Sequence, residues 1–387
     1  MTVKKDSFPF YIFLTYVIYY AGQAIYNTFG TVYLSESGFS QSVIGLMASV
    51  ATAALILIQP LWGILSDRSK NKNHVAGIVI LISAVIILAV YLNNSLWWIA
   101  ACYIGFSIFY GPAATLQDNC TLEALEGSRW NFGNVRLGGT LGYMFCALIV
   151  GFFIKDYNQT YLWTALFFIP AGLMLFFTRA TNSTHGQKAE KVRYRSILSN
   201  KPLLCIVLYN VLYTVAGTFS RYYTIHYTEN LGATSLMLSL CTVIASLVEI
   251  PFFWYAGRIE RKLGIMNTFL LSGALLVIRY ILFSFITDPI WVIAVYTINS
   301  CGWALSNFSV LSYINNHVPA GARATSQSLN SILATVFSSI IFAPIAGFFC
   351  DTLGTPVTLL IGAALMAVTM VVFRIVFPRL EKAQASE

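Results

Sequence analysis

The chain has 387 residues, of which 57% are hydrophobic and only 10% are charged, and its mean hydropathy is +0.71. A soluble globular domain carries about 25% charged residues, so this composition excludes a soluble protein and predicts one embedded in a lipid bilayer. The formal net charge of +8 would indicate nucleic-acid binding only on a soluble basic face. The sequence offers no such face, and we expect no nucleic-acid partner.

Twelve apolar runs follow one another along the chain. A spanning helix needs about 20 mostly apolar residues, and runs of this length without two-residue alternation are helices rather than barrel strands. We predict spans at residues 8–34, 41–66, 74–92, 96–118, 134–154, 160–178, 203–227, 233–256, 265–286, 290–314, 324–350 and 356–377.

The longest polar stretch divides these spans into six and six. Residues 1–180 hold the first six, residues 181–201 form a linker, and residues 202–387 hold the second six. Two halves joined in this way are typical of transporters built from parallel repeats, with a binding site near the midplane. The expected fold is all-α, with two pseudo-symmetric six-helix bundles.

Basic residues predict the orientation. With the N-terminus in the cytoplasm, Lys155 is the one basic residue left for an outside loop, as the positive-inside rule requires. We therefore place the protein in the cytoplasmic (inner) membrane, with the linker and both termini in the cytoplasm. The first apolar run is longer than the roughly 7–15 residues of a signal peptide, so we expect it to be the first span.

Cofactor chemistry finds no support in the sequence. The seven cysteines and four histidines show no metal-ligand spacing. No loop of the type G-x-x-x-x-G-K-[ST] is present, so ATP is not the expected energy source. We expect no metal, no other cofactor and no catalytic site, and thus a protein that is not an enzyme.

Four charged residues stand inside otherwise apolar spans, namely Asp118, Arg136, Glu249 and Arg279. A charge at the bilayer centre costs about 2.5–3.5 kcal/mol on insertion scales. Such residues face a cavity, pair with one another, or handle an ion or a substrate. They are the first candidates for a transport site.

Asp118 and Arg136 flank the short loop between the fourth and fifth spans, so their side chains can meet across this helical hairpin. A guanidinium offers a rigid fork of donors and a carboxylate offers paired acceptors. Together they can bind vicinal hydroxyls, a carboxylate or each other; the alternative is a buried ion pair that only holds the helices together. Tyr143 lies two turns after Arg136 on the same face, either in this site or as a packed aromatic.

Glu249 and Arg279 are the charged residues of the eighth and ninth spans. Burial of a carboxyl group favours its protonated form, whereas a nearby arginine favours the carboxylate. A carboxyl group balanced between these effects can take up and release a proton near neutral pH, as proton coupling requires. The alternative is a static salt bridge.

Two further sets of residues complete the candidates. In the first span Gln23, Tyr26 and Asn27 share a polar face with Tyr20, and we expect this stripe to line the pathway. A cytoplasmic gate is expected at the end of the second span, with the residues Gly63, Asp67, Arg68 and Lys70. A similar pattern of glycine and charged residues recurs in the same place of the second half, at residues 257–264. The alternative is a solvated turn whose charges only set the topology.

Segment 59–68 resembles the loop-2/3 signature of the major facilitator superfamily, and segment 118–143 resembles the oligosaccharide:proton symporters (lactose permease-like) and the related phenylpropionate permeases. The resemblance implies that Asp118 and Arg136 bind sugar hydroxyls and that a sugar ring stacks on Tyr143. Phenylpropionate-type relatives look similar around Glu249 and Arg279. The histidine and glutamate of helix ten in lactose permease have no counterpart at residues 299–307, which leaves the proton carrier and lactose itself open.

These features predict a secondary active transporter that takes up a small polar solute, with a sugar or oligosaccharide as the expected substrate. The expected mechanism is proton symport through alternating access, driven by the proton gradient. The alternatives are uptake of an aromatic or other organic acid, with Arg136 on its carboxylate, or of a nucleoside. Drug efflux is disfavoured by the polar site and a transporter-like sensor by the short linker. We expect a functional monomer.

Overall fold

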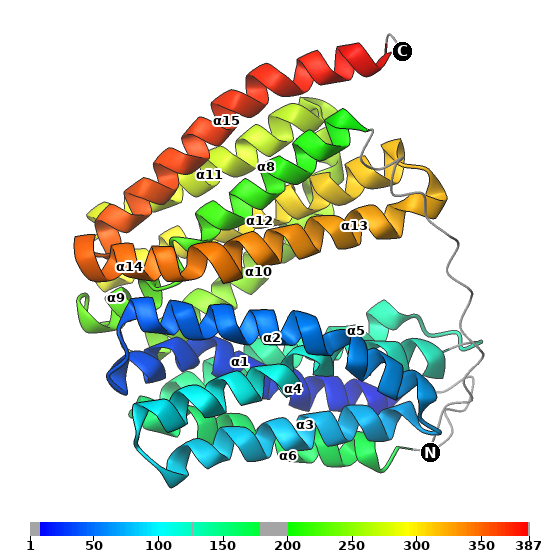
Figure 1. Cartoon of the computed structure of the whole chain (residues 1–387), viewed down its shortest axis with the longest axis vertical. Coiled ribbons are helices and arrows are strands. Elements are labelled where there is room, and N and C mark those ends of the chain that lie inside the picture. The colour runs from blue at the N-terminus through cyan, green and yellow to red at the C-terminus, as the bar shows by residue number, and fades with distance from the viewer. Residues whose placement is uncertain (1–7, 126, 179–199, 386–387) are drawn as a thin grey trace. The chain divides into compact units, whose positions relative to one another are not determined.

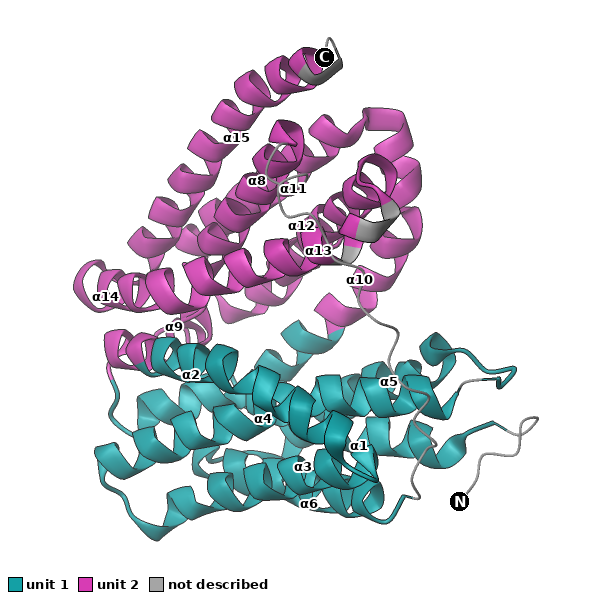
Figure 2. Cartoon of the chain, turned by 45° about the vertical axis from the view of Figure 1, so that its right-hand side comes forward, with its two compact units in different colours: residues 1–39, 47–186, 234–243 teal, residues 40–46, 187–233, 244–387 magenta. Residues whose placement is uncertain are grey.

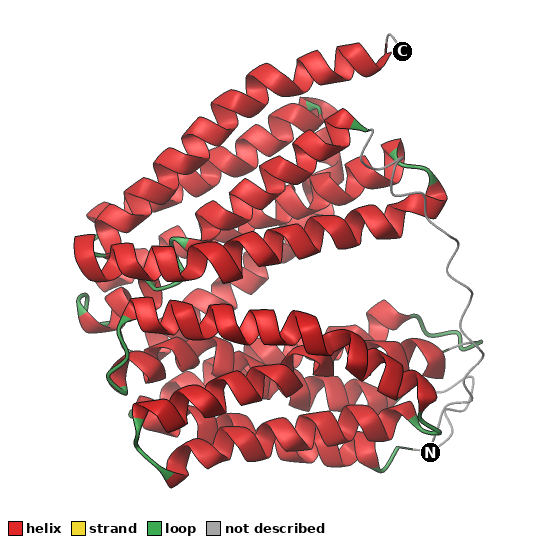
Figure 3. Ribbon diagram, viewed as in Figure 1, coloured by secondary structure: helices red, strands yellow, loops and turns green. Residues whose placement is uncertain are grey.

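The computed structural model describes residues 8–125, 127–178 and 200–385, and every regular element in these ranges is a helix (Figure 3). The predicted linker lies outside the described residues except for its last two, Asn200 and Lys201. Asn200 caps the helix that follows, because its side chain accepts a hydrogen bond from the backbone N–H of Leu203.

The first part of the chain forms six long helical segments (Figure 1). Two of them are extended by a short 3-10 turn, η1 after α3 and η2 before α6. The elements are α1 (Phe10–Glu36), α2 (Gln41–Arg68), α3 (Lys72–Ala89), η1 (Val90–Leu92), α4 (Leu96–Ala124), α5 (Phe132–Phe153), η2 (Tyr157–Gln159) and α6 (Thr160–Phe176).

The second part forms six more helical segments, and two of these are irregular. One is divided into α8 and α9, and another contains the π-helical segment η3 between α13 and α14. The elements are α8 (Lys201–Thr218), α9 (Tyr223–Glu229), α10 (Ser235–Leu263), α11 (Ile265–Phe285), α12 (Pro289–His317), α13 (Ala320–Thr335), η3 (Val336–Phe342), α14 (Ala343–Leu353) and α15 (Thr355–Ala385).

Ten of the helical segments in the described ranges are long and apolar enough to cross a membrane. The other two, α1 with 27 residues and α12 with 29, complete the predicted twelve, so the predicted all-α transmembrane fold is confirmed. Several helices run past the predicted spans. In particular α4 continues to Ala124, which places Asp118 inside the helix rather than at its end.

Two compact units make up the chain (Figure 2). Unit 1 comprises residues 1–39, 47–186 and 234–243, and unit 2 comprises residues 40–46, 187–233 and 244–387. Most of α2 thus belongs to unit 1, while its first residues belong to unit 2. Conversely, most of α10 belongs to unit 2, while its first residues belong to unit 1. The predicted boundaries at residues 180 and 202 stay a prediction.

Glycines bring α1 and α5 close together within unit 1. A Cβ on Gly142 would lie 2.1 Å from the carbonyl oxygen of Val17, and one on Gly138 would lie 2.7 Å from that of Phe13. These two glycines form a G-x-x-x-G pattern, which allows helix backbones to approach closely in membranes. The close approach sets the polar face of α1 beside the arginine of α5.

Candidate functional site

Asp118 of α4 and Arg136 of α5 meet in unit 1. The Nε of Arg136 lies 3.7 Å from Oδ1 of Asp118, and the two side chains are 32% and 33% exposed. The separation is long for a charge-assisted hydrogen bond, which is about 2.7–2.9 Å. A third of each side chain is open, so the pair is accessible to a solute rather than sealed in the core.

Two tyrosines of α1 make the shorter bonds to this pair. Tyr16 donates from its hydroxyl to Oδ1 of Asp118 at 2.7 Å, and Arg136 donates from Nη2 to the Tyr20 hydroxyl at 2.7 Å. The guanidinium carbon also lies 4.0 Å from the centre of the Tyr20 ring, a cation–π distance. Gly139 leaves room for this arrangement, since a Cβ there would lie 2.5 Å from Nη1 of Arg136.

A second polar cluster lies farther along the same face of α1. Gln23 donates from Nε2 to the Tyr110 hydroxyl at 2.8 Å, and Asn27 interacts with the hydroxyls of Tyr110 and Tyr143. Tyr20, Gln23 and Asn27 of the predicted stripe are therefore neighbours on one face of α1, and Tyr16, which was not predicted, lies four residues before Tyr20 on the same face. Tyr143 belongs to this second cluster and makes no described contact with Arg136.

Aromatic rings surround the second cluster. The ring of Tyr26 packs against Phe106, Tyr110 and Tyr161 at centroid distances of 4.8, 5.3 and 6.2 Å. Tyr26 thus contributes a ring within an aromatic group, whereas Gln23 and Asn27 contribute the polar groups. Asn27 is exposed, so its amide remains available to a solute.

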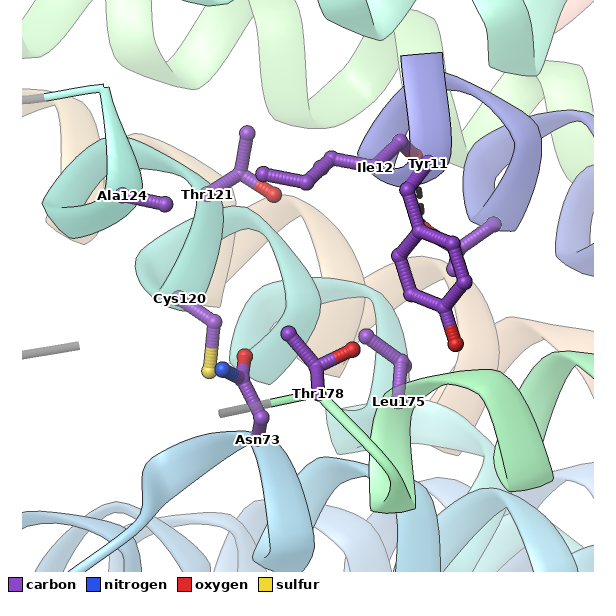
Figure 4. A pocket seen from close by; sticks show the side chains of 9 residues that line it. Tyr11, Ile12, Asn73, Cys120, Thr121, Ala124, Leu175 and Thr178 are labelled. Atoms are coloured by element: carbon purple, nitrogen blue, oxygen red, sulfur yellow. Dashed lines mark hydrogen bonds between the residues drawn. The ribbon is translucent and has the colours of Figure 1, made fainter. Parts of the chain in front are cut away.

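A small cavity of about 20 Å³ lies near the Asp118 cluster, between α1, α3, α4 and the end of α6. Figure 4 shows the side chains that line it, among them Thr121, whose hydroxyl lies 3.2 Å from that of Tyr16. A water molecule needs roughly 10–15 Å³ of such space. The cavity has room for a single water and none for a sugar-sized solute.

Arg279 of α11 is buried in unit 2, with 4% of its surface exposed. Its Nη2 donates to the hydroxyl of Ser220 at 2.7 Å, and its guanidinium carbon lies 4.8 Å from the centre of the Tyr280 ring. Its Nε has no partner among the described residues. No carboxylate in the described ranges lies within 4 Å of it.

Glu249 of α10 is half-buried and makes no described hydrogen bond or ion pair. The structure therefore does not bring Glu249 and Arg279 together, although their pairing underlay the predicted proton site. The physical reason is direction: Arg279 faces the end of α8, where Ser220 receives it. The proton-coupling roles of both residues stay predictions.

A groove of about 700 Å³ follows α10 just beyond Glu249. Its lining is aromatic near Glu249 and basic toward the predicted cytoplasmic end. The residues are Pro251, Phe252, Tyr255, Arg258, Ile259, Arg261 and Lys262.

The gate residues lie at the end of α2. Lys72 contacts Asp67 at 3.4 Å and makes a closer contact with Glu123 of α4. Asp67 is 77% exposed, Arg68 and Lys70 are also exposed, and a Cβ on Gly63 would meet nothing within 4 Å. Within unit 1, no neighbouring helix in the described ranges packs closely on Gly63, and the gate function stays a prediction.

Sequence reasoning missed Tyr16, Tyr110 and Ser220. The spacing of Tyr16, four residues before Tyr20 on the same helix face, was an available signal. Tyr110 and Ser220 carry no such signal, because their roles depend on which face of a neighbouring helix they meet.

Comparisons with known proteins agree with the fold. The profile of the MFS_1 like family matches residues 11–361. An uncharacterized transporter, YwbF of Bacillus subtilis, is 25% identical over 332 residues, which cover 83% of this chain and 81% of that protein. The maltose permease of Geobacillus stearothermophilus is 22% identical over 90% of this chain and 88% of its own length.

Among solved structures, that of the nucleoside transporter NupG superposes with a TM-score of 0.82. The match has 16% sequence identity and covers 94% of this chain and 98% of that one. At this identity the likeness concerns the fold alone.

Proposed function

Because the chain belongs to the MFS_1 like family of membrane transporters, we propose that it takes up a small polyhydroxylated solute, a sugar or oligosaccharide, by proton symport through alternating access. The observation that carries this proposal is the partly exposed Asp118–Arg136 pair, held by Tyr16 and Tyr20 in unit 1. The proton gradient supplies the energy, and the working form is a monomer in the cytoplasmic membrane with both termini in the cytoplasm.

The chemistry of the pair suits neighbouring hydroxyl groups. A hydroxyl both donates and accepts, so one hydroxyl of a diol can donate to Asp118 while the next accepts from Arg136. The long Nε–Oδ1 separation of 3.7 Å leaves hydrogen-bonding capacity that a tight pair would use up. The ring of Tyr20, already under the guanidinium, adds an apolar wall.

An anionic solute fits this site less well. Arg136 could bind a carboxylate, but Asp118 lies beside it and would repel a second negative charge. We therefore rank an aromatic or other organic acid below a neutral solute.

A nucleoside is the second candidate. Its ribose carries a vicinal diol for Asp118 and Arg136, and its base would need a polar contact flanked by rings. The cluster of Gln23, Asn27, Tyr110 and Tyr26 offers both. This observation keeps the nucleoside in the proposal as the alternative to an oligosaccharide.

Proton coupling has two candidate carriers. Glu249 is a half-buried carboxyl group without a described partner, so its protonation breaks no contact seen here. Asp118 is the other, because a proton on it would alter the diol site directly. We propose Glu249 as the proton carrier in preference to Asp118.

Uptake into proteoliposomes tests the proposal. The purified protein is reconstituted, a pH gradient is imposed, and accumulation of labelled maltose, uridine and phenylpropionate is compared with and without the gradient. We expect gradient-dependent accumulation of maltose or, for the alternative, of uridine. Accumulation of phenylpropionate alone would show that the substrate is an organic acid and not a neutral solute. Equal uptake with and without the pH gradient would exclude proton coupling.

A further inference from the structure

The seventh span is interrupted near its predicted outer end. α8 ends at Thr218 and α9 begins at Tyr223. Between them the backbone makes i→i+3 bonds, from the N–H of Phe219 to Ala216 and from that of Ser220 to Gly217. A tightened stretch of this kind within a helix often marks a hinge.

Ser220 stands at the centre of this interruption. Its hydroxyl donates to the Gly217 carbonyl at 2.9 Å and accepts from Nη2 of Arg279 at 2.7 Å. The hydroxyl of Tyr280 donates to the Ala216 carbonyl at 2.8 Å and lies 3.1 Å from Oγ of Ser220. Two adjacent buried residues of α11 thus hold the end of α8.

The burial of Arg279 costs free energy. A buried charge without a counterion is strongly unfavourable, and no acidic side chain in the described ranges pairs with it. Ser220, to which it donates, directly follows the carboxyl-terminal end of α8, where helix carbonyls carry partial negative charge that favours a cation. The charge is therefore directed at the interruption itself.

The other side of the interruption is held by the second irregular segment, η3, and by the first residue of α14. Arg221 donates from Nη2 to the Ser339 hydroxyl in η3 at 3.2 Å, and Tyr222 donates to the carbonyl of Ala343 at 2.9 Å. π-helical segments often occur at functional sites. α9 then packs on α11 through Tyr223, which stacks on Phe283 at a centroid distance of 4.2 Å.

We propose that Arg279 is a positioning residue for the transport cycle. Through Ser220 it fixes the interruption of the seventh span and thereby the orientation of α9, and the Arg279–Ser220 bond breaks when α9 moves. The inference rests on the proposed alternating-access cycle, but on neither the identity of the solute nor proton coupling.

Cysteine labelling tests this inference without a solute. Thr224, half-buried in α9, is replaced by cysteine as the reporter, and exposed Glu229 is replaced separately as a reference. Each variant is reconstituted and treated with a membrane-impermeant maleimide, and modification is followed on the peptide that carries the new cysteine. Ser220→Ala should raise the labelling rate of the Thr224→Cys reporter about tenfold, the factor for losing one charge-assisted hydrogen bond.

Two further variants make the test specific. Ser220→Asp gives the guanidinium a carboxylate, so it should slow labelling of the reporter below the wild-type rate. Ser284→Ala is the matched control, because the Ser284 hydroxyl bonds the carbonyls of Tyr280 and Pro356 and not the interruption. It should leave the rate unchanged, as should every variant at the Glu229→Cys reference.

A purely structural role would lower the amount of folded protein without these opposite shifts in rate. Equal reporter rates in the wild-type, Ser220→Ala and Ser220→Asp backgrounds overturn the inference. The same rise in Ser284→Ala overturns it as well. Neither result bears on which solute is carried or on the proton, because labelling needs neither a solute nor a gradient.

Discussion

Asp118 and Arg136 approach each other to 3.7 Å, yet each makes its shorter bond with a tyrosine of α1. Tyr16 holds the carboxylate and Tyr20 holds the guanidinium, both at 2.7 Å. The two charges are thus fixed by a third helix rather than by one another. This arrangement separates a prepared binding site from a simple ion pair between α4 and α5.

Conservative changes at the pair should therefore weaken binding strongly and spare the fold. Arg136→Lys keeps the charge but loses the planar fork, and Asp118→Asn loses the charged acceptor. We expect each to lower solute affinity more than tenfold, as for loss of a hydrogen bond to a charged group, in a protein that remains monodisperse. Binding of the solute found by the uptake screen provides the measurement.

The reversed pair distinguishes the alternative. If Asp118→Arg combined with Arg136→Asp restores transport, the two residues act as an ion pair and the binding assignment is wrong.

The role of α1 can be tested by removing single hydroxyl groups. Tyr16→Phe deletes the bond to Asp118 and should reduce solute affinity several-fold, in line with about 0.5–1.5 kcal/mol for a hydrogen bond. Tyr19→Phe is the matched control, since the Tyr19 hydroxyl has no partner among the described residues. Equal affinities for the two variants would contradict the positioning role of Tyr16.

Helix contact in unit 1 should depend on Gly142 and not on Gly63. Gly142→Ala forces a Cβ to within 2.1 Å of a backbone oxygen of α1, so it should destabilise the protein by about 1–3 kcal/mol, the usual cost of overpacking. Gly63→Ala meets open space and should be neutral or slightly stabilising. Thermal unfolding in detergent measures both, and a loss of stability in Gly63→Ala alone would reverse the assignment.

Proton coupling through Glu249 predicts a split between uptake and exchange. Glu249→Gln mimics the permanently protonated side chain, so uphill accumulation should vanish because the carrier cannot return with its proton released. Exchange of labelled for unlabelled solute needs no proton turnover and should continue. If uphill accumulation persists in this variant, the proton site moves to Asp118 or the protein is a uniporter.

Much of the fold was predictable because the bilayer restricts what a chain can do. Long apolar runs gave the twelve helical segments, and the short loop between Asp118 and Arg136 indicated that their side chains could meet. The packing of the helices themselves differs, because α5 packs mainly on α1 rather than on α4. The position of Asp118 within α4 was harder, since α4 continues as a polar helix to Ala124. Hydropathy marks the membrane and not the end of a helix.

The direction in which a buried side chain points was not predictable. Glu249 and Arg279 occupy comparable depths in consecutive spans, but the rotation of α11 about its axis aims Arg279 at Ser220. The glycines give the same lesson. Gly63 and Gly142 both stand in helices, and only the packing shows that a backbone lies against one of them.

The bonds around Asp118 also have a stereochemical consequence. Tyr16 and Arg136 both approach Oδ1, and Oδ2 has no described partner. On the proposed function, a solute therefore meets one free carboxylate oxygen beside the guanidinium, and we expect a solute whose ring is held in place to present two neighbouring hydroxyls to both groups in one configuration. An epimer inverted at either carbon should bind at least about fivefold more weakly, since it leaves one polar group unsatisfied. Competition between epimeric sugars would show whether the transporter distinguishes mirror arrangements at a single carbon atom.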